Sequence, residues 1–196
     1  GAGRKTALFT CRHSGYGHSH IESLGDLMTY DVAVIGLGYV GLTLATALAN
    51  VGLKVLGVEK RLDVVEATNR GEPHFAETGL SETLTFVTRS GMLTAREAFP
   101  KGAEATVYII TVGTPLDAEG NARLDMIQAA TRDVAANMSD GALIVLRSTV
   151  KVRTTRDVVM PILDQSGRSY HVAMCPERTL EGRAMHELRE LPQIVG

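Results

Sequence analysis

A glycine-rich turn that follows a short apolar run constrains this chain more than any other feature. Residues 31–36 read as a strand buried on both faces, and Gly36-Leu-Gly-Tyr-Val-Gly41 begins at its end. This turn fits G-x-G-x-x-G, where the first glycine permits a tight turn, the second lets a pyrophosphate approach, and the third lets helix pack on strand. Apolar residues then recur at helical spacing up to Val51, and Gly52 can end a helix. The pattern predicts the start of a dinucleotide-binding βαβ unit.

An acidic residue stands where such a unit needs one. The next expected strand, residues 54–58, ends at Glu59, which lies 18 residues after Gly41. A carboxylate there accepts hydrogen bonds from the adenosine ribose and repels a 2′-phosphate, so the sequence predicts NAD rather than NADP. The positive charges of the adjacent Lys60 and Arg61 could reduce this preference for NAD over NADP. A turn that serves packing alone is disfavoured, because strand, turn, helix, strand and acid all follow in order.

Strand and helix patterns alternate through the rest of the chain. Further strands are expected at residues 92–95, 106–111, 142–146 and 171–174, and helices at residues 80–90, 124–138 and 154–163. Pro161 should kink or shorten the last of these helices. The predicted fold is α/β, a Rossmann-type, doubly wound, mostly parallel six-stranded sheet in a single domain.

Composition excludes several classes of protein. A length of 196 residues corresponds to roughly one domain. The formal net charge of −2 gives no positive field for nucleic acid, and no apolar run is long enough to span a membrane. Only Cys11 and Cys175 occur, in no metal-ligand spacing, so no metal site is expected and a reducing cytoplasmic location fits.

Residues 1–27 differ in composition from the remainder. Glycine, serine, arginine and histidine dominate them, and a strand pattern begins soon after Met28. We expect a natural start at Met28, with residues 1–27 a tag or misassigned leader and residues 28–196 the folded domain. His13, His18 and His20 lack acidic or cysteine partners, so a solvated leader is favoured over a metal site.

Several further segments sit at expected strand ends, where open α/β sheets bind ligands. They are Thr111-Val-Gly-Thr-Pro115, Arg147-Ser-Thr-Val150 and Cys175-Pro-Glu-Arg-Thr-Leu-Glu-Gly182, with Asn69-Arg-Gly-Glu-Pro73, Glu77-Thr-Gly-Leu80 and Leu191-Pro-Gln-Ile-Val-Gly196 elsewhere. With the glycine-rich turn, their order and spacing resemble the UDP-glucose/GDP-mannose dehydrogenase family. The Pro-Glu-Arg form at 176–178 looks most like the branch that includes UDP-N-acetylmannosamine dehydrogenase.

The resemblance implies a cytoplasmic, homodimeric enzyme that oxidises the C6 alcohol of a UDP-sugar to the carboxylate. Two NAD are consumed, and the sugar passes through an enzyme-bound thiohemiacetal and thioester. By the same resemblance the cofactor contacts are Gly36, Leu37, Gly38, Tyr39, Val40 and Gly41 at the pyrophosphate, Glu59 and Lys60 at the adenosine, Val112, Gly113, Thr114 and Pro115 along the cofactor, and Ser148, Thr149 and Glu181 toward the nicotinamide.

The resemblance also implies catalytic and substrate-binding roles. Thr149 would position a water and Glu177 would act as general acid/base in thioester hydrolysis, with Glu181 near cofactor and substrate. A carboxylate beside a desolvated nicotinamide can have its pKa raised toward neutrality, which suits that task. Without the resemblance, Glu177 would read as a solvated loop carboxylate. Arg178 either binds a substrate anion or pairs with Glu181, and the sequence favours neither.

Two departures from the family's pattern limit the prediction. Val64 stands where the family often has a basic residue against adenosine, so Lys60 or Arg61 would have to replace it. The family's nucleophilic cysteine and its oxyanion-stabilising lysine and asparagine belong to a central helix and a C-terminal domain. Cys175 has no histidine or lysine neighbour in sequence and reads as a buried structural thiol. We therefore expect the N-terminal NAD-binding domain, which binds NAD without turnover.

Two other readings remain open. One is a stand-alone NAD-binding module, such as a nucleotide sensor or a subunit that lends its cofactor site to a partner. The other is the cofactor domain of a β-hydroxyacid-type dehydrogenase, although Pro176-Glu177 and the Glu177/Glu181 pair argue against it. The sequence that follows Gly196 in the gene would separate these readings.

Overall fold

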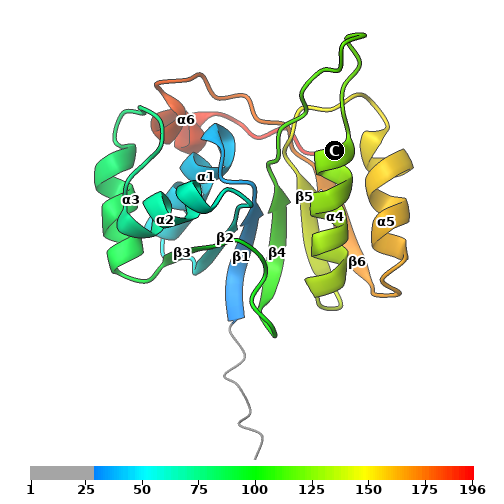
Figure 1. Ribbon diagram of the computed structural model, residues 1–196, viewed down its shortest axis with the longest axis horizontal. Coiled ribbons are helices and arrows are strands. Elements are labelled where there is room, and N and C mark those ends of the chain that lie inside the picture. Colours follow the sequence, from blue (N-terminus) through cyan, green and yellow to red (C-terminus); the bar gives the residue numbers. More distant parts are fainter. Residues whose placement is uncertain (1–28) are drawn as a thin grey trace, which may run out of the picture.

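Six parallel strands form one sheet at the centre of the computed structural model, which describes residues 29–196 (Figure 1). The strands are β1 (Thr29–Ile35), β2 (Val55–Val58), β3 (Leu93–Arg96), β4 (Glu104–Ile110), β5 (Ala142–Leu146) and β6 (Tyr170–Met174). Their spatial order is β3-β2-β1-β4-β5-β6, and every pairing is parallel. This is the doubly wound order in which a switch point lies between β1 and β4. The predicted fold class is confirmed.

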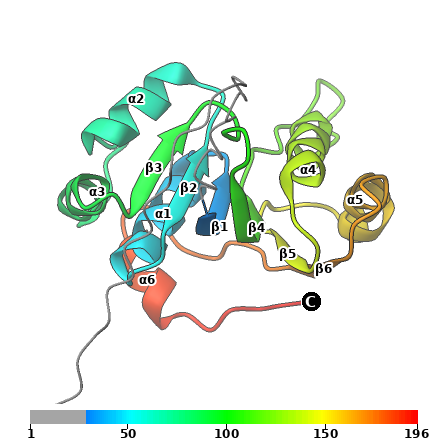
Figure 2. The same cartoon turned by 90° about the horizontal axis from the view of Figure 1, so that it is seen from below.

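Helices cover both faces of the sheet. They are α1 (Tyr39–Asn50), α2 (Leu62–Arg70), α3 (Leu80–Arg89), α4 (Asp125–Asn137), the π-helical turn η1 (Thr155–Val159), α5 (Met160–Asp164) and α6 (Ala184–Glu190). One apolar cluster joins α4 and α5 to one face, and a second joins α1, α2, α3 and α6 to the other. The view from below shows α4 and α5 on one side of the sheet and α1 and α6 on the opposite side (Figure 2). The aliphatic composition suits this arrangement, because parallel strands are buried on both faces.

Helix α1 buries more of its surface than its amphipathic pattern indicated. Leu42, Ala45 and Ala49 are almost completely buried, while Val51, one of the residues that predicted the helix, is 69% exposed. The helix lies between the sheet and the helices α3 and α6, so residues on several of its sides are covered. A single apolar stripe therefore identified the helix but not the side that it buries.

Pro161 changes the helix in which it lies. The sequence predicted one helix over residues 154–163, and the structure has the π-helical turn η1 followed directly by α5, with Pro161 near the start of α5. Proline has no N–H for the usual helical hydrogen bond and its ring clashes with the carbonyl four residues earlier. A wider turn before it accommodates both effects.

Helices α2 and α6 were not predicted from the sequence. Helix α2 is largely polar and buries only Val64, Val65 and Thr68, and α6 is a short helix of seven residues. Within residues 29–196 no helix is long and apolar enough to cross a membrane, and no three potential metal ligands cluster. The predicted leader, with its histidines, lies outside the described residues.

Candidate functional site

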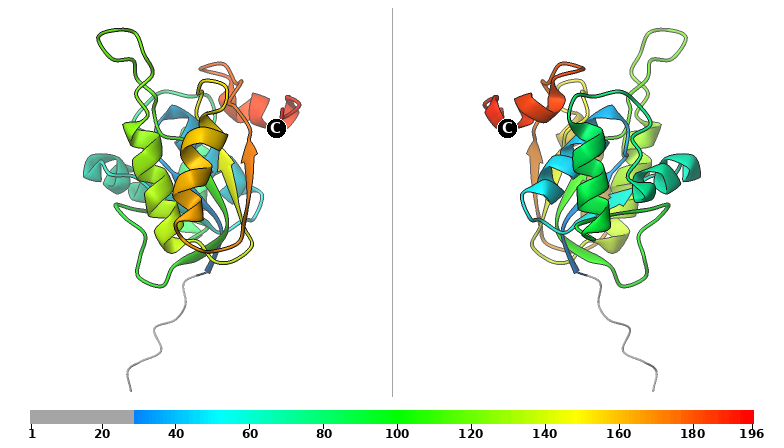
Figure 3. Two further views of the ribbon diagram at one scale, coloured as in Figure 1. Left: turned by 90° about the vertical axis from the view of Figure 1, so that its right-hand side faces the viewer. Right: turned by 90° about the vertical axis from the view of Figure 1, so that its left-hand side faces the viewer.

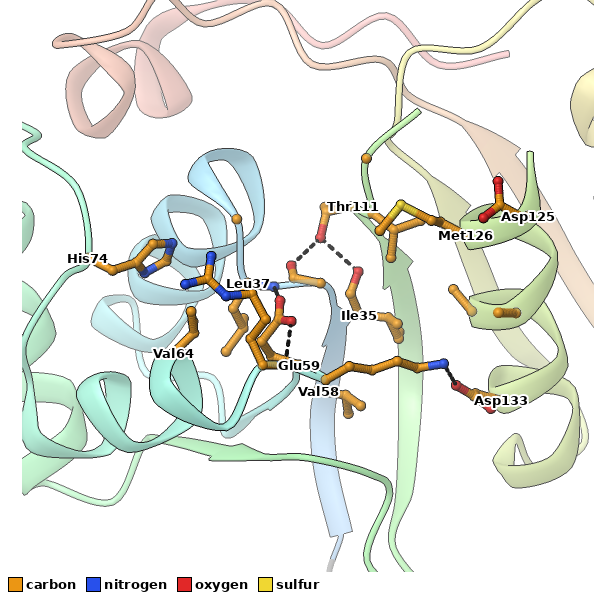
Figure 4. Close-up of a pocket in the computed structure, with 18 residues that line it drawn as sticks. Ile35, Leu37, Val58, Glu59, Val64, His74, Thr111, Asp125, Met126 and Asp133 are labelled. Atoms are coloured by element: carbon orange, nitrogen blue, oxygen red, sulfur yellow. Dashed lines mark hydrogen bonds and ion pairs between the residues drawn. The ribbon is translucent and has the colours of Figure 1, made fainter. Parts of the chain in front are cut away.

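A cleft of about 450 Å³ opens at the carboxyl ends of β1, β2 and β4. Its residues come from the glycine-rich turn, the end of β2, the loop after β4 and one side of α4 (Figure 4). Of the predicted cofactor contacts, Gly36, Leu37, Gly38, Glu59, Lys60, Val112 and Gly113 line it. The cleft thus lies at the switch point of the sheet, where open α/β folds bind ligands.

The three glycines of the turn have three different surroundings. Gly36 has φ +93°, a left-handed conformation that other residues rarely adopt. A Cβ on Gly41 would lie 1.8 Å from the Gly36 carbonyl oxygen, whereas a Cβ on Gly38 would meet nothing within 4 Å. The turn is therefore tight at Gly36, closely packed at Gly41 and open at Gly38. These are the three properties expected of a turn that admits a pyrophosphate.

The start of α1 faces the same opening. Gly38 is the residue before the helix, and no side chain among the described residues caps it by a hydrogen bond. The first backbone N–H groups of a helix have no partner within the helix, and the helix dipole adds a partial positive charge there. An anionic diphosphate would accept hydrogen bonds from these N–H groups and would be attracted by the partial positive charge. The residues present therefore fit a dinucleotide.

Glu59 is held against the glycine-rich turn. Its Oε2 accepts a hydrogen bond from the Leu37 N–H at 2.9 Å, and its Oε1 accepts one from the Arg61 N–H at 2.9 Å. Thr111 also contacts the turn, because its Oγ1 donates a hydrogen bond to the Gly36 carbonyl oxygen at 2.7 Å (Figure 4). The half-buried Glu59 carboxylate is fixed at the end of β2, in the position from which it can meet a ribose.

The walls of the cleft include residues that the sequence did not indicate. Met126 and Asp133 lie on α4, and His74 lies in the loop between α2 and α3 (Figure 4). Lys60 extends across the cleft floor to Asp133, with Nζ 3.6 Å from Oδ2. Neither histidine nor aspartate at these places belongs to a recognisable motif, so only the fold brings them to the cleft.

Val64 also lines the cleft, and the nearby cations are both paired. Arg61 pairs with Asp63 at 2.5 Å, and the hydrogen bond that Arg61 donates to the Asp63 carboxylate raises the pKa of Arg61. Lys60 pairs with Asp133. Whether Lys60 or Arg61 replaces the missing basic residue at adenosine stays a prediction.

Two hydrogen bonds join the loops that follow β4 and β5. Thr114 Oγ1 donates to the Thr149 carbonyl oxygen at 2.9 Å, and Ser148 Oγ donates to the Val112 carbonyl oxygen at 2.7 Å. Beyond Pro115 the β4–α4 loop projects from the body of the protein (Figure 3). Thr149 is exposed and lines a separate hollow beside Pro176. Ser148 and Thr149 are thus hydrogen-bonded to the loop after β4 but do not line the main cleft.

The surroundings of Glu177 differ from both interpretations of the sequence, which were a solvated loop carboxylate and a carboxylate with a raised pKa. Its side chain is 11% exposed and forms an ion pair with buried Arg147, with Nη2 2.5 Å from Oε2. Burial raises the pKa of Glu177, but the hydrogen bonds from the Thr179 N–H and Arg147 together outweigh it, and the pKa is lowered. The pKa of Glu177 is lowered rather than raised in this arrangement because the Thr179 N–H and Arg147, at the end of β5, both contact the carboxylate. The position of Arg147, a charged residue directly after an apolar strand, was the feature of the sequence that could have indicated this ion pair.

The remaining predicted residues follow the same loop. Arg178 does not pair with Glu181 in the described part of the chain, and its Nη1 donates to the Pro192 carbonyl oxygen at 3.3 Å. Glu181 is exposed. Cys175 is 7% exposed, as predicted for a buried thiol, and lies 3.2 Å from Arg147 Nη1.

Tyr39 links the glycine-rich turn to this loop. Its hydroxyl donates to Glu77 Oε2, and the Gly182 N–H lies 2.7 Å from the same oxygen. Burial, followed by the hydrogen bond to Glu77, raises the pKa of Tyr39 to about 12. The predicted contact residue Tyr39 therefore fixes neighbouring segments with its side chain, and Val40 follows it in the first turn of α1.

Comparison with known proteins decides the family. A sequence model described as "UDP-glucose/GDP-mannose dehydrogenase family, NAD binding domain" matches residues 30–196. The chain belongs to this family of dehydrogenases. A UDP-N-acetyl-D-mannosamine dehydrogenase of Methanococcus aeolicus is 35% identical over 84% of the chain and 38% of its own length. The Salmonella typhi protein of the same name is 32% identical over 84% of the chain and 41% of its own length.

Solved structures of family members agree with the fold. A UDP-D-ManNAc dehydrogenase from Pyrococcus horikoshii superposes with a TM-score of 0.79 at 32% identity, over 86% of this chain and 41% of that one. A UDP-glucose dehydrogenase from Pyrobaculum islandicum gives 0.78 at 31% identity, over 88% and 41%. The chain corresponds to the NAD-binding domain of the dehydrogenase family, and NAD is its cofactor. It spans about two fifths of the length of these relatives.

Proposed function

We propose that residues 28–196 form the NAD-binding domain of a nucleotide-sugar 6-dehydrogenase that oxidises a UDP-sugar. The observation that carries this proposal is the cleft at the switch point, where an open Gly38, an uncapped helix start and a fixed Glu59 carboxylate converge. These features fit a diphosphate and a ribose at adjacent positions. Bound NAD would supply the acceptor for a hydride from the sugar.

The individual site roles are part of the proposal. The glycine-rich turn and the N-terminus of α1 would hold the diphosphate, and Glu59 would hold the ribose. Ser148, Thr149 and Glu181 would face the nicotinamide, and Thr149 and Glu177 would serve the hydrolytic step. The hydrogen bonds that join the loops after β4 and β5 support a common site for Ser148, Thr149 and the cofactor-contacting residues of the β4 loop.

The substrate is proposed as UDP-N-acetylmannosamine or UDP-glucose, because relatives with both names are similar to this chain. We propose that two NAD are consumed per sugar, and that turnover and dimerisation need the part of the relatives that this chain does not match. Cys175 supports this division, because the buried thiol in the described residues is packed against Arg147 rather than exposed in the cleft. The 196-residue chain should bind NAD and leave the sugar unchanged.

One assay tests both halves of this proposal. The chain is mixed with NAD and either UDP-N-acetylmannosamine or UDP-glucose, and NADH is followed by its absorbance. Binding is followed separately by the fluorescence of added NADH, which no tryptophan obscures because the chain has none. We expect saturable NADH binding and no NADH formation. Measurable turnover would contradict the proposed division, and the absence of saturable binding would contradict the proposed function.

A further inference from the structure

A buried guanidinium lies between three segments at one end of the sheet. Arg147, directly after β5, is 5% exposed. Its Nε and Nη2 donate to Glu177 Oε2 at 2.9 and 2.5 Å, and its Nη1 donates to Gln193 Oε1 at 3.0 Å and contacts Cys175 Sγ at 3.2 Å. One side chain therefore joins the end of β5, the loop after β6 and the segment that contains Gln193.

The partner carboxylate is fully engaged. Glu177 Oε1 accepts hydrogen bonds from the N–H groups of Arg178 at 2.6 Å and Thr179 at 2.8 Å, while Oε2 takes both bonds from Arg147. An ionised carboxylate accepts about four hydrogen bonds through its two oxygens. If the carboxyl were protonated, one of its oxygens would carry a hydrogen atom and could no longer accept all of these hydrogen bonds. The geometry therefore requires the ionised form.

Backbone contacts hold the same three segments in place. The Glu177 N–H donates to the Arg147 carbonyl oxygen at 3.3 Å, and the Cys175 N–H donates to the Leu146 carbonyl oxygen at 2.9 Å. Met174 and Gly196 exchange two backbone hydrogen bonds, at 2.7 and 2.9 Å, which hold the Gln193 segment along β6. These bonds fix the backbone on both sides of the Arg147–Glu177 pair, so any movement of the carboxylate is a movement of its side chain.

We propose that Arg147 is a positioning residue that fixes the Glu177 carboxylate, in its ionised form, against the carboxyl ends of β5 and β6. Its connection with catalysis rests on the proposed function, which gives Glu177 its acid/base role. In this arrangement Glu177 is a proton acceptor and not a donor at neutral pH, and it must leave Arg147 before it reaches a substrate.

Few other ionisable groups bear on this carboxylate. Among the described residues, the ion pair recorded for Glu177 is with Arg147, while Arg178 contacts it through its backbone N–H and directs its guanidinium to Pro192. Cys175 contacts the opposite side of the Arg147 guanidinium. Removing Arg147 therefore removes the one cation in contact with the carboxylate, whereas removing the Arg178 charge does not.

The test is a carboxyl titration by 13C NMR of the 196-residue chain labelled at glutamate, without cofactor. The Glu177 signal is assigned by its loss in Glu177→Gln. We expect Glu177 to titrate below the usual range of a glutamate carboxyl in the wild type. Arg147→Gln should raise the Glu177 midpoint by about one pH unit or more, because an opposite charge in contact has at least that effect. Arg178→Gln is the matched control and should leave it unchanged.

A second variant keeps the test decisive if Arg147→Gln does not fold. Arg147→Lys retains the charge but donates from a single nitrogen, so it should place the Glu177 midpoint above the wild type and below that of an unpaired carboxyl. A wild-type Glu177 that titrates at or above the usual range of a glutamate carboxyl, or a midpoint that Arg147→Lys leaves unchanged, overturns the proposal. None of these readouts needs NAD, so a failure here is distinct from a failure of NAD binding.

Discussion

The space available to a Cβ atom differs among the glycines of the glycine-rich turn. Gly41 lies so close to the Gly36 carbonyl that a side chain has no room, while Gly38 faces open space. Glu59 accepts a backbone hydrogen bond from Leu37, inside the same turn. The glycine-rich turn and Glu59, the acid proposed to hold the ribose, are therefore joined by a hydrogen bond. Substitutions in this unit should separate effects on stability from effects on NAD binding.

Alanine at the two glycines should have opposite effects on folding and binding. Gly41→Ala places a Cβ against backbone and should destabilise the protein by at least about 1–3 kcal/mol, the usual cost of overpacking. Gly38→Ala has φ −66° and a free Cβ position, so it should unfold at nearly the wild-type temperature. Its methyl group occupies the diphosphate space, so NAD affinity should fall about tenfold or more, about 1.4 kcal/mol. Thermal unfolding and calorimetric titration measure the two effects, and a Gly38→Ala variant with wild-type NAD affinity would contradict the placement of the diphosphate.

The Tyr39 hydroxyl should matter for binding as well as for stability. Tyr39→Phe removes the bond to Glu77 but keeps the ring against Phe75, and should cost about 0.5–1.5 kcal/mol of unfolding free energy. Tyr170→Phe is the control, because Tyr170 also donates to a carboxylate, Asp164, and burial likewise raises its pKa to about 12. Urea unfolding should show similar losses for both. Only Tyr39→Phe should weaken NADH binding, measured by fluorescence, and equal binding in the two variants would show that Tyr39 does not position the turn.

At the level of elements, the strands and the glycine-rich unit were predictable, because buried parallel strands are short apolar runs with turn residues at their ends. The polar helix α2 was not, since its small buried face gives a weak periodic signal. The β4–α4 loop and the position of His74 depend on how the elements pack, which no local pattern encodes. Arg147 and Glu177 both belong to segments that the sequence analysis singled out, but they are 30 residues apart in the chain. The direction of the Glu177 pKa shift could not be predicted, because it depends on the contact that the fold makes between these two residues.

The contact between α2 and α3 offers a test at this scale. Gly71 ends α2 with φ +79°, and a Cβ there would lie 2.8 Å from Thr85 Cα on α3. Gly102 has φ +76° but open space around it. Gly102→Ala should cost about 1 kcal/mol from the left-handed backbone alone, and Gly71→Ala should cost about 1–3 kcal/mol more from overpacking. Denaturant unfolding of both variants measures the difference, and equal losses would contradict the close approach of the two helices.

The lowered pKa of Glu177 has a consequence for the stability of the protein in acid. Because its folded pKa lies below the unfolded value, the ion pair contributes stability that is fully present above the unfolded pKa and is lost as pH falls through the folded pKa. Glu177→Gln should flatten the acid limb of a plot of unfolding free energy against pH, while Glu181→Gln should not. An unchanged acid limb in Glu177→Gln would show that the pair does not form in solution.

At the scale of the whole molecule, the doubly wound sheet gathers distant segments at one edge. The cleft, the loops after β4 and β5 and the Arg147–Glu177 pair all lie at the carboxyl ends of the strands. Family membership accounts for this common placement, and the glycine-rich cleft accounts for the cofactor. The fold therefore supplies a cofactor site next to an anchored loop that carries the proposed acid/base residue.

The most direct test of this account is a calorimetric titration of the 196-residue chain with NAD and, in parallel, with NADP. We expect saturable one-to-one binding of NAD and binding of NADP that is weaker by about tenfold or more, because a Glu59 carboxylate placed as proposed would accept hydrogen bonds from the ribose and repel a 2′-phosphate. Glu59→Gln should narrow that difference. Equal affinities for the two cofactors, or no saturable binding of NAD, would contradict the assignment of the cleft.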